Sequence, residues 1–211
     1  REKTLAVCGA VGAETVAVED SLGRVLAEDA AAREDIPPFP RSPYDGYALR
    51  AGDVKDASDA VPVTLEIIEE IPAGHMPQKR VGPGQAAKIL TGAPVPDGAD
   101  MIVKFEDTKF TADAVTVFRR GRSGENIVPA GEDVKRGCTV MEKGSVISPA
   151  YIGLLVGLGY SGIRVYRRPR VAIISTGDEL AGTGSELTPG KIRNSSAHML
   201  KAYMENFAAV R

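Results

Sequence analysis

The sequence predicts a mostly-β, α+β protein of one or two domains. Its 211 residues exceed the ~100–150 residues of a common single domain. Residues 60–118 hold β-type segments between Gly- and Pro-rich connections, and residues 148–158 carry a helix-start signal. Beyond residues 167–170, an apolar run, a loop and an amphipathic segment follow one another, as at the beginning of an α/β domain.

The first elements are short. Residues 15–18 and 24–27 predict two strands on either side of a turn at 20–23. Four prolines then stand within residues 37–43, which excludes a helix or a central strand there. This segment is predicted to be a fixed loop or an extended linker.

Further strands are predicted at 61–68, 86–90, 101–105 and 114–118. The last two are expected to pair across a turn near residues 111–113. Ser148 followed by Pro149 predicts a helix that runs to about Leu158. Residues 144–163 carry no charge, but their glycines, serines and proline argue against a membrane span.

The last region reads as one strand–loop–helix unit. The continuous apolar run at 171–174 predicts a parallel strand buried on both faces. An amphipathic helix is predicted over 195–210, capped by Asn194 or Ser195, and its apolar side comprises Leu200, Tyr203, Met204, Phe207 and Val210. One such unit cannot bury both faces of a sheet, so we expect this region to be incomplete or to be completed by something else.

The composition argues against several classes of function. With 26 basic and 28 acidic residues the formal charge is −2, which argues against a nucleic-acid or membrane-surface protein. Cys8 and Cys138 form no metal-binding pattern, and neither do His75 and His198. The cysteines are predicted to be reduced core thiols of a cytoplasmic protein.

Four loops place a carboxylate or hydroxyl beside Gly or Pro. Asp45 precedes Gly46, which is expected to permit a turn, and Thr91 follows a strand end. Asp133 lies in a Gly-Glu-Asp run, and Glu179 follows the apolar run at 171–174, where ligands bind in α/β sheets. Each loop also reads as an ordinary turn, and no Walker, GxSxG or HExxH motif is present.

Taken in order, several stretches carry a family resemblance: DSLGRVLAED (20–29), PPF (37–39), YDGYA (44–48), ILTGAPVPDGAD (89–100), GED (131–133) and STGDEL (175–180). They resemble the molybdopterin molybdenumtransferases, the MoeA/gephyrin E-domain family. The resemblance implies an elongated, multi-domain protein whose chain continues beyond residue 211, through the rest of an α/β domain to a β-barrel domain.

By position, the resemblance implies a discontinuous linker domain at 13–31 and 138–168 and a β-rich middle domain at 32–137. Residues 169–211 would begin a molybdopterin-binding α/β domain similar to MoaB and MogA, and residues 1–12 would pack against it. The 211 residues alone are then expected to be inactive.

The resemblance also implies an activity. Family members insert molybdate into adenylylated molybdopterin and release AMP, assisted by a divalent cation, typically Mg²⁺. Four positions match the family's catalytic residues: Asp45, Thr91, Asp133 and Glu179. The three acids are expected to position metal, molybdate or water, and Thr91 to bind an oxyanion.

Substrate-binding positions are also implied by the matching motifs: Ser42, Ser175, Thr176, Gly177, Asp178, Asn194 and Ser195. The resemblance further implies a cytoplasmic homodimer, with Asp45 and Glu179 acting from different chains, and a molybdopterin adenylyltransferase as the upstream partner.

The sequence departs from the family pattern at three places. Pro40 and Arg41 replace an Asp and an Asn or Thr, Tyr44 replaces a Met, and Ser196 stands where an Asn is usual. The alternative functions are therefore a molybdopterin-binding or scaffolding paralogue without turnover, or a purely structural module.

Overall fold

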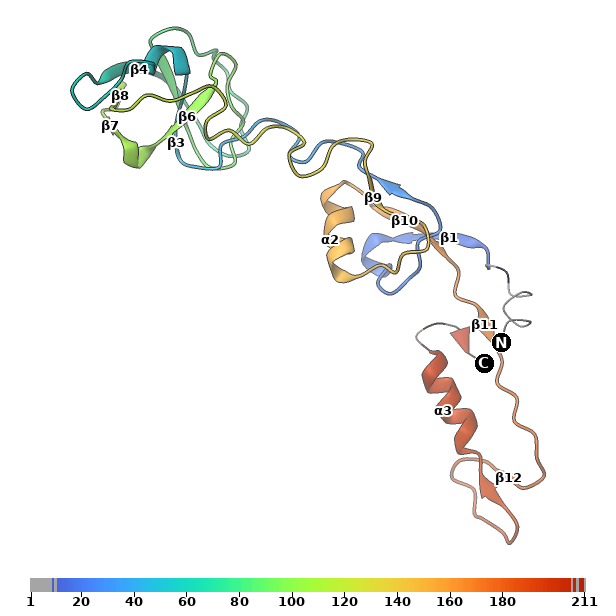
Figure 1. Ribbon diagram of the computed structural model, residues 1–211. Coiled ribbons are helices and arrows are strands. Elements are labelled where there is room, and N and C mark those ends of the chain that lie inside the picture. Colours follow the sequence, from blue (N-terminus) through green and yellow to red (C-terminus); the bar gives the residue numbers. More distant parts are fainter. Residues whose placement is uncertain (1–8, 10, 206, 208, 211) are drawn as a thin grey trace. The chain divides into compact units, whose positions relative to one another are not determined.

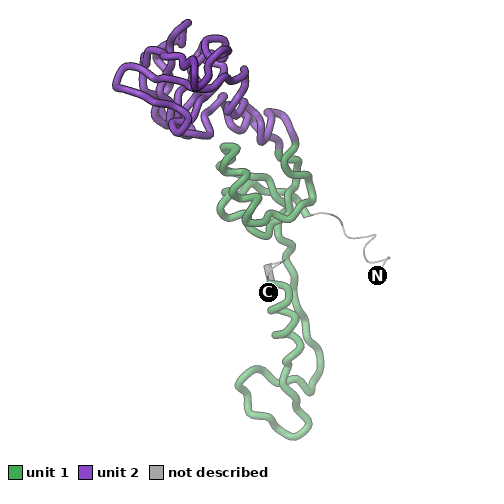
Figure 2. Tube along the Cα trace, turned by 60° about the vertical axis from the view of Figure 1, so that its left-hand side comes forward, with its two compact units in different colours: residues 1–30, 139–211 green, residues 31–138 purple. Residues whose placement is uncertain are grey.

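The computed structural model describes residues 9, 11–205, 207, 209 and 210 (Figure 1). Within them the chain forms two compact units (Figure 2). One unit holds the residues up to Ala30 and those from Thr139 onward, and the other holds Ala31–Cys138. The second unit is therefore inserted into the sequence of the first.

A six-stranded sheet builds the Ala31–Cys138 unit, in the spatial order β6-β3-β5-β4-β8-β7. Its strands are β3 (Gly46–Leu49), β4 (Val63–Ile71), β5 (Gln85–Ile89), β6 (Met101–Lys104), β7 (Thr108–Phe110) and β8 (Ala114–Val117). Two 3₁₀ helices, η2 (Ala51–Val54) and η3 (Phe105–Asp107), follow β3 and β6. β4 and β5 are parallel, and the other neighbours are antiparallel.

The inner strand β3 is buried on both faces because its side chains alternate between two apolar clusters. Tyr47 and Leu49 pack in one cluster with Val103, whereas Ala48 packs in the other with Ile102. The prolines before β3 obscured this strand in the sequence. The four strands predicted between residues 61 and 118 are confirmed as β4, β5, β6 and β8.

The predicted pairing of the last two strands is wrong. β6 pairs with β3, whereas β8 pairs with β4 and β7. The turn at 111–113 joins β7 to β8, with the Thr111 amide donating to the Ala114 carbonyl at 2.8 Å. β7 has only three residues, too few to show a periodic pattern, and η3 redirects the chain before it.

The other unit is organised around β1 (Ala13–Ala17), which pairs antiparallel with β10 (Gly162–Tyr166). Beside them lies α2 (Pro149–Gly157), whose Leu155 is fully buried in the unit's apolar cluster. The helix prediction is confirmed, and Ser148 caps α2 by accepting a hydrogen bond from the Tyr151 amide at 3.4 Å.

The strand predicted at 24–27 is wrong. Val25 and Leu26 form only isolated bridges, because β10 occupies the position beside β1. The remaining elements before α2 are η1 (Val18–Asp20), β2 (Ala30–Ala31) and β9 (Thr139–Met141). No helix among the described residues is long and apolar enough to cross a membrane.

Residues beyond 169 form β11 (Arg170–Val171) parallel to β14 (Ala209–Val210), β12 (Leu180–Ala181) parallel to β13 (Ile192–Arg193), and α3 (Ser195–Met204). The prediction of a buried strand at 171–174 is wrong, since Ile174 is 83% exposed. α3 ends at Met204 instead of continuing to 210. Asn194 caps it, accepting from the Ala197 amide at 3.2 Å.

The exposure of residues 171–174 has a physical cause. A parallel strand is buried only where other elements cover both of its faces, and the described residues give β11 one neighbouring strand. The domain boundaries at 13–31, 138–168, 32–137 and 169–211 stay predictions. The expected packing of residues 1–12 falls mainly on 1–8 and 10, outside the described residues, as does Cys8. Cys138 is free and exposed at the unit's edge, so it is not a core thiol.

Candidate functional site

The clearest polar arrangement joins Asp45 to Thr91. The Thr91 amide and hydroxyl both donate to Oδ1 of Asp45, at 2.7 and 2.8 Å. Strand register explains the meeting: Gly46 pairs with Ile89 where β3 and β5 run antiparallel, so the residue before β3 lies beside the residues after β5. Oδ2 of Asp45 receives no hydrogen bond from the described residues.

These bonds fix the charge state of Asp45. Its pKa is lowered from the usual value, first by the hydrogen bond from the Thr91 amide and then by that from the Thr91 hydroxyl. Asp45 is therefore an ionised carboxylate at neutral pH and a weak proton acceptor. This chemistry suits the positioning of a cation or of water better than proton abstraction.

Asp45 and Thr91 line an open depression of about 570 Å³, whose other lining residues are Pro43, Tyr44, Lys104, Glu106 and Asp107. The Lys104 ammonium lies 3.9 Å from the centroid of the Tyr44 ring. Lys104 at the end of β6 and Glu106 and Asp107 in η3 were not predicted as site residues. A signal for them was available, because three charged residues stand within the four positions after the apolar residues 101–103.

Gly46 serves a different purpose from the predicted one. It lies in β3, outside the left-handed region, and a Cβ there would lie 2.1 Å from the Val103 carbonyl oxygen. Gly46 therefore permits the close approach of β6 to β3 rather than a turn. The expectation of a turn at this position is wrong.

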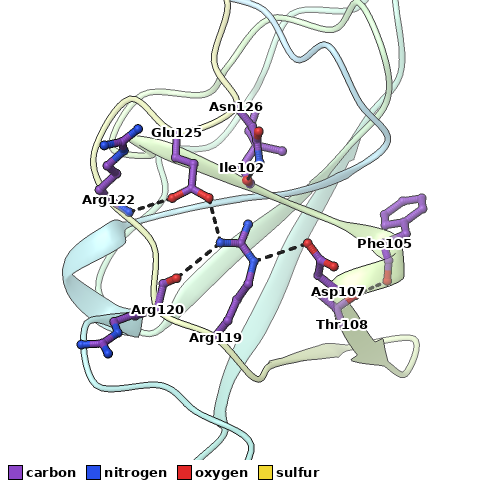
Figure 3. Close-up of polar contacts among 9 residues, drawn as sticks. All are labelled: Ile102, Phe105, Asp107, Thr108, Arg119, Arg120, Arg122, Glu125 and Asn126. Carbon is purple, nitrogen blue, oxygen red and sulfur yellow. Dashed lines mark hydrogen bonds and ion pairs between the residues drawn. The ribbon is translucent and has the colours of Figure 1, made fainter.

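An ion-pair network fixes the chain beside the depression (Figure 3). Arg119 contacts Glu125 at 2.7 Å and Asp107 at 3.4 Å. The adjacent bend is closed by the Thr108 hydroxyl, which donates to the Phe105 carbonyl at 2.9 Å. Arg119 thus holds η3, which carries Asp107 and Glu106.

Other predicted residues of this unit lie outside that lining. Ser42 is fully buried, and its hydroxyl accepts a hydrogen bond from the Tyr44 amide at 3.2 Å, which holds the loop before Asp45. A substrate contact of Ser42 stays a prediction. Asp133 is exposed, with its amide donating to the Ile36 carbonyl at 2.9 Å. Arg41 has a buried Nε without a hydrogen-bond partner.

The remaining predicted residues belong to the other unit. The Ser175 hydroxyl donates to Oδ1 of Asn194 at 3.3 Å, so the loop after β11 contacts the cap of α3. The carboxylate of Glu179 lies against Gly177, whose φ is +149°, and a Cβ there would lie 2.5 Å from both carboxylate oxygens. Lys191 donates to the Asp178 carbonyl. Thr176 and Ser195 are exposed.

The predicted metal ligands each offer carboxylate oxygens. Asp45 has a free Oδ2, and neither Asp133 nor Glu179 forms an ion pair with the described residues. Within the described residues, no group of three or more His, Cys, Asp or Glu is arranged to hold a metal. The donors fit Mg²⁺, which is commonly bound by one or two carboxylates together with water and substrate oxygens.

A fixed, ionised carboxylate and a lysine in one open depression form a site suited to charged small ligands. Comparison with known proteins identifies the family of the chain. Residues 1–159 match the family described as the MoeA N-terminal region (domain I and II). The chain belongs to this family.

Its relatives agree with that assignment. The chain is 46% identical to a molybdopterin molybdenumtransferase of Bacillus subtilis (strain 168) over 90% of its length, and 44% identical to one of Staphylococcus aureus (strain Mu50) over 90%. The molybdopterin biosynthesis moeA protein of Pyrococcus horikosii superposes with a TM-score of 0.93 at 35% identity, covering 99% of this chain and 54% of that one. The chain spans 45% and 46% of the two curated relatives, about half their length.

Proposed function

We propose that this chain acts within a molybdopterin molybdenumtransferase of molybdenum cofactor biosynthesis. The substrates would be adenylylated molybdopterin and molybdate, and the products AMP and the molybdenum cofactor. The observation that carries the proposal is Asp45, fixed by Thr91 at an open depression within the segments shared with the family. The relatives' names give the reaction class.

Asp45 contributes a negative charge at a fixed position. Thr91 uses both of its donors on Asp45, so its role is to position the carboxylate instead of binding a substrate oxyanion directly. The free Oδ2 then accepts from water or binds a cation. Mg²⁺, when bound, would neutralise the charge that develops as the pyrophosphate bond breaks.

Asp133 and Glu179 are proposed as further metal- or water-positioning residues, and the loops at 175–179 and 194–195 as substrate-binding. We also propose a cytoplasmic homodimer in which Asp45 and Glu179 act from different chains, and a molybdopterin adenylyltransferase as the source of the substrate. Asp133 and Glu179 are exposed residues, which supports their proposed positioning roles because a metal ion or water can reach them.

The test supplies the natural full-length protein with adenylylated molybdopterin, molybdate and Mg²⁺, and measures AMP and molybdenum cofactor. Asp45→Asn is expected to lower AMP release at least about a hundredfold because it removes the fixed charge. Asp56→Asn, an exposed Asp outside the depression, serves as the control and should release AMP normally.

AMP release no higher than background in the unmodified protein would reject the proposal. Tight molybdopterin binding combined with unchanged turnover in Asp45→Asn would instead favour the non-catalytic paralogue.

A further inference from the structure

Lys104 is the cation of the depression that contains Asp45 and Thr91. It ends β6 directly opposite Gly46, and its ammonium lies 3.9 Å from the centroid of the Tyr44 ring. The next residue reinforces this arrangement, because the Phe105 amide donates to the Asp45 carbonyl at 3.2 Å. The pairing of β3 with β6 therefore holds Lys104 beside the loop that carries Tyr44 and Asp45.

The ammonium of Lys104 has no carboxylate partner among the described residues. Lys88 on the neighbouring strand differs, since it pairs with Glu70 at 3.1 Å. Asp107 in the lining is engaged by Arg119 instead of Lys104. A ring face attracts the cation but leaves some of its N–H donors unused. The Tyr44 ring thus fixes Lys104 while leaving hydrogen-bonding capacity for a ligand.

The charges around Lys104 define what it would bind. Asp45 and Glu106 are carboxylates of the same lining, so a bare anion meets repulsion as well as attraction. An oxyanion that carries a divalent cation would fit both signs of charge, because the carboxylates would hold the cation and the ammonium would bind the oxygens.

We propose that Lys104 binds a tetrahedral oxyanion, a phosphate group or molybdate, as its Mg²⁺ complex, and that Tyr44 positions the ammonium for this contact. This inference rests on the proposed function and names a specificity-determining pair within its site. Lys104 contacts the ligand, whereas Tyr44 acts through Lys104 and is a positioning residue.

The first experiment titrates the 211-residue chain with inorganic phosphate, molybdate or AMP in the presence of Mg²⁺ and follows the side-chain NMR signals of Lys104. Saturable shifts are expected. Lys104→Met should weaken binding about tenfold, as for one charge-assisted hydrogen bond. Lys104→Arg should retain most of the affinity because it retains the charge.

Two comparisons separate positioning from charge. Tyr44→Met should weaken binding about threefold, since the ring face is lost, whereas Tyr44→Phe keeps the ring and the affinity. Lys109→Met is the matched control: its ammonium also lies over a ring, 5.3 Å from the centroid of Phe118, but it lies outside the lining of this depression. It should leave binding unchanged.

The second experiment uses the full-length protein. Lys104→Met should raise the KM for the substrate that Lys104 contacts about tenfold, with a smaller change in kcat. A raised KM for molybdate identifies molybdate as the oxyanion. A raised KM for adenylylated molybdopterin identifies a phosphate group instead. If no titration shifts the Lys104 signals, or if Lys104→Met binds with the affinity of the unmodified protein, the inference is overturned.

Normal AMP release with both KM values unchanged in Lys104→Met would also overturn the inference, but it would leave the proposed function standing. A protein without AMP release that still binds oxyanions through Lys104 would refute the function alone.

Discussion

At the residue scale, the state of Asp45 is set by a single neighbour. Thr91 directs two donors at the same carboxylate oxygen, so position and ionisation are fixed together even though Asp45 is exposed. The sequence indicated Asp45 and Thr91 separately, each beside a glycine. Nothing in either loop indicated that the two residues contact one another.

Replacing Thr91 tests this relationship. In Thr91→Val the hydroxyl donor is lost and the amide donor remains, so the pKa of Asp45 should rise only part of the way toward its usual value of 3.8. Because the folded-state pKa of Asp45 is lowered, the two hydrogen bonds stabilise the fold above the unfolded-state pKa, and this stabilisation is lost as the pH falls through the folded-state pKa.

A ¹³C NMR titration of the Asp45 carboxyl measures its pKa. Thr91→Ser, which keeps both donors, should titrate like the unmodified protein; an unshifted pKa in Thr91→Val would contradict the assignment.

A second residue, Gly46, is required by packing. Gly46→Ala places a methyl group 2.1 Å from the Val103 carbonyl oxygen, so β3 and β6 must separate. We expect a loss of about 3 kcal/mol in the free energy of unfolding, measured with urea. Gly52→Ala is the matched control, because a Cβ at Gly52 meets no atom within 4 Å. Equal stability of the two variants would show that β6 moves without cost.

At the element scale, the short corner between β6 and β7 connects the sheet to the depression. η3 carries Glu106 and Asp107 into the lining, and Arg119, far along the chain, holds Asp107 (Figure 3). Strand patterns predicted most of the sheet because its apolar residues alternate or run continuously. They did not predict this corner, because a three-residue helix has no period to detect.

Removing Arg119 tests the corner. Arg119→Met should lower the free energy of unfolding by about 1 kcal/mol, a modest value because solvent screens this partly exposed ion pair. Arg119 lowers the pKa of Glu125 below its usual 4.5, so the stability difference should be largest near neutral pH and shrink as the pH falls through the lowered pKa. Urea unfolding at several pH values measures it. Lys55→Met, whose ion pair is exposed and 4.0 Å long, should change little; a pH-independent loss in Arg119→Met would contradict the role of Glu125.

At the scale of the whole molecule, the Ala31–Cys138 unit contains its own core. Both of its apolar clusters draw every member from within this range. The two ends of the unit also meet, because the Ala32 amide donates to the Cys138 carbonyl at 2.9 Å and the Gly137 amide to the Ala32 carbonyl at 2.8 Å. These are the features of an inserted, independently folding domain.

We therefore expect residues 31–138 to fold on their own. NMR should show dispersed amide signals, and urea should unfold the chain in one cooperative transition. Leu65→Ala in that shortened chain should lower its free energy of unfolding by about 2–5 kcal/mol, since Leu65 is 2% exposed in the core. A non-cooperative transition, or one unaffected by Leu65→Ala, would show that the unit depends on the rest of the chain.

The amino-acid sequence alone determined most of the strands, helix α2 with its cap, and the motifs that carry Asp45 and Thr91, because these features depend on local periodicity and local turn chemistry. Only the tertiary structure decided which strands pair, that Thr91 serves Asp45, and that Tyr44 and Lys104 share the same depression. Those relations join residues tens of positions apart through backbone hydrogen bonds and close packing. The local sequence pattern of a strand does not show which distant strand will pair with it.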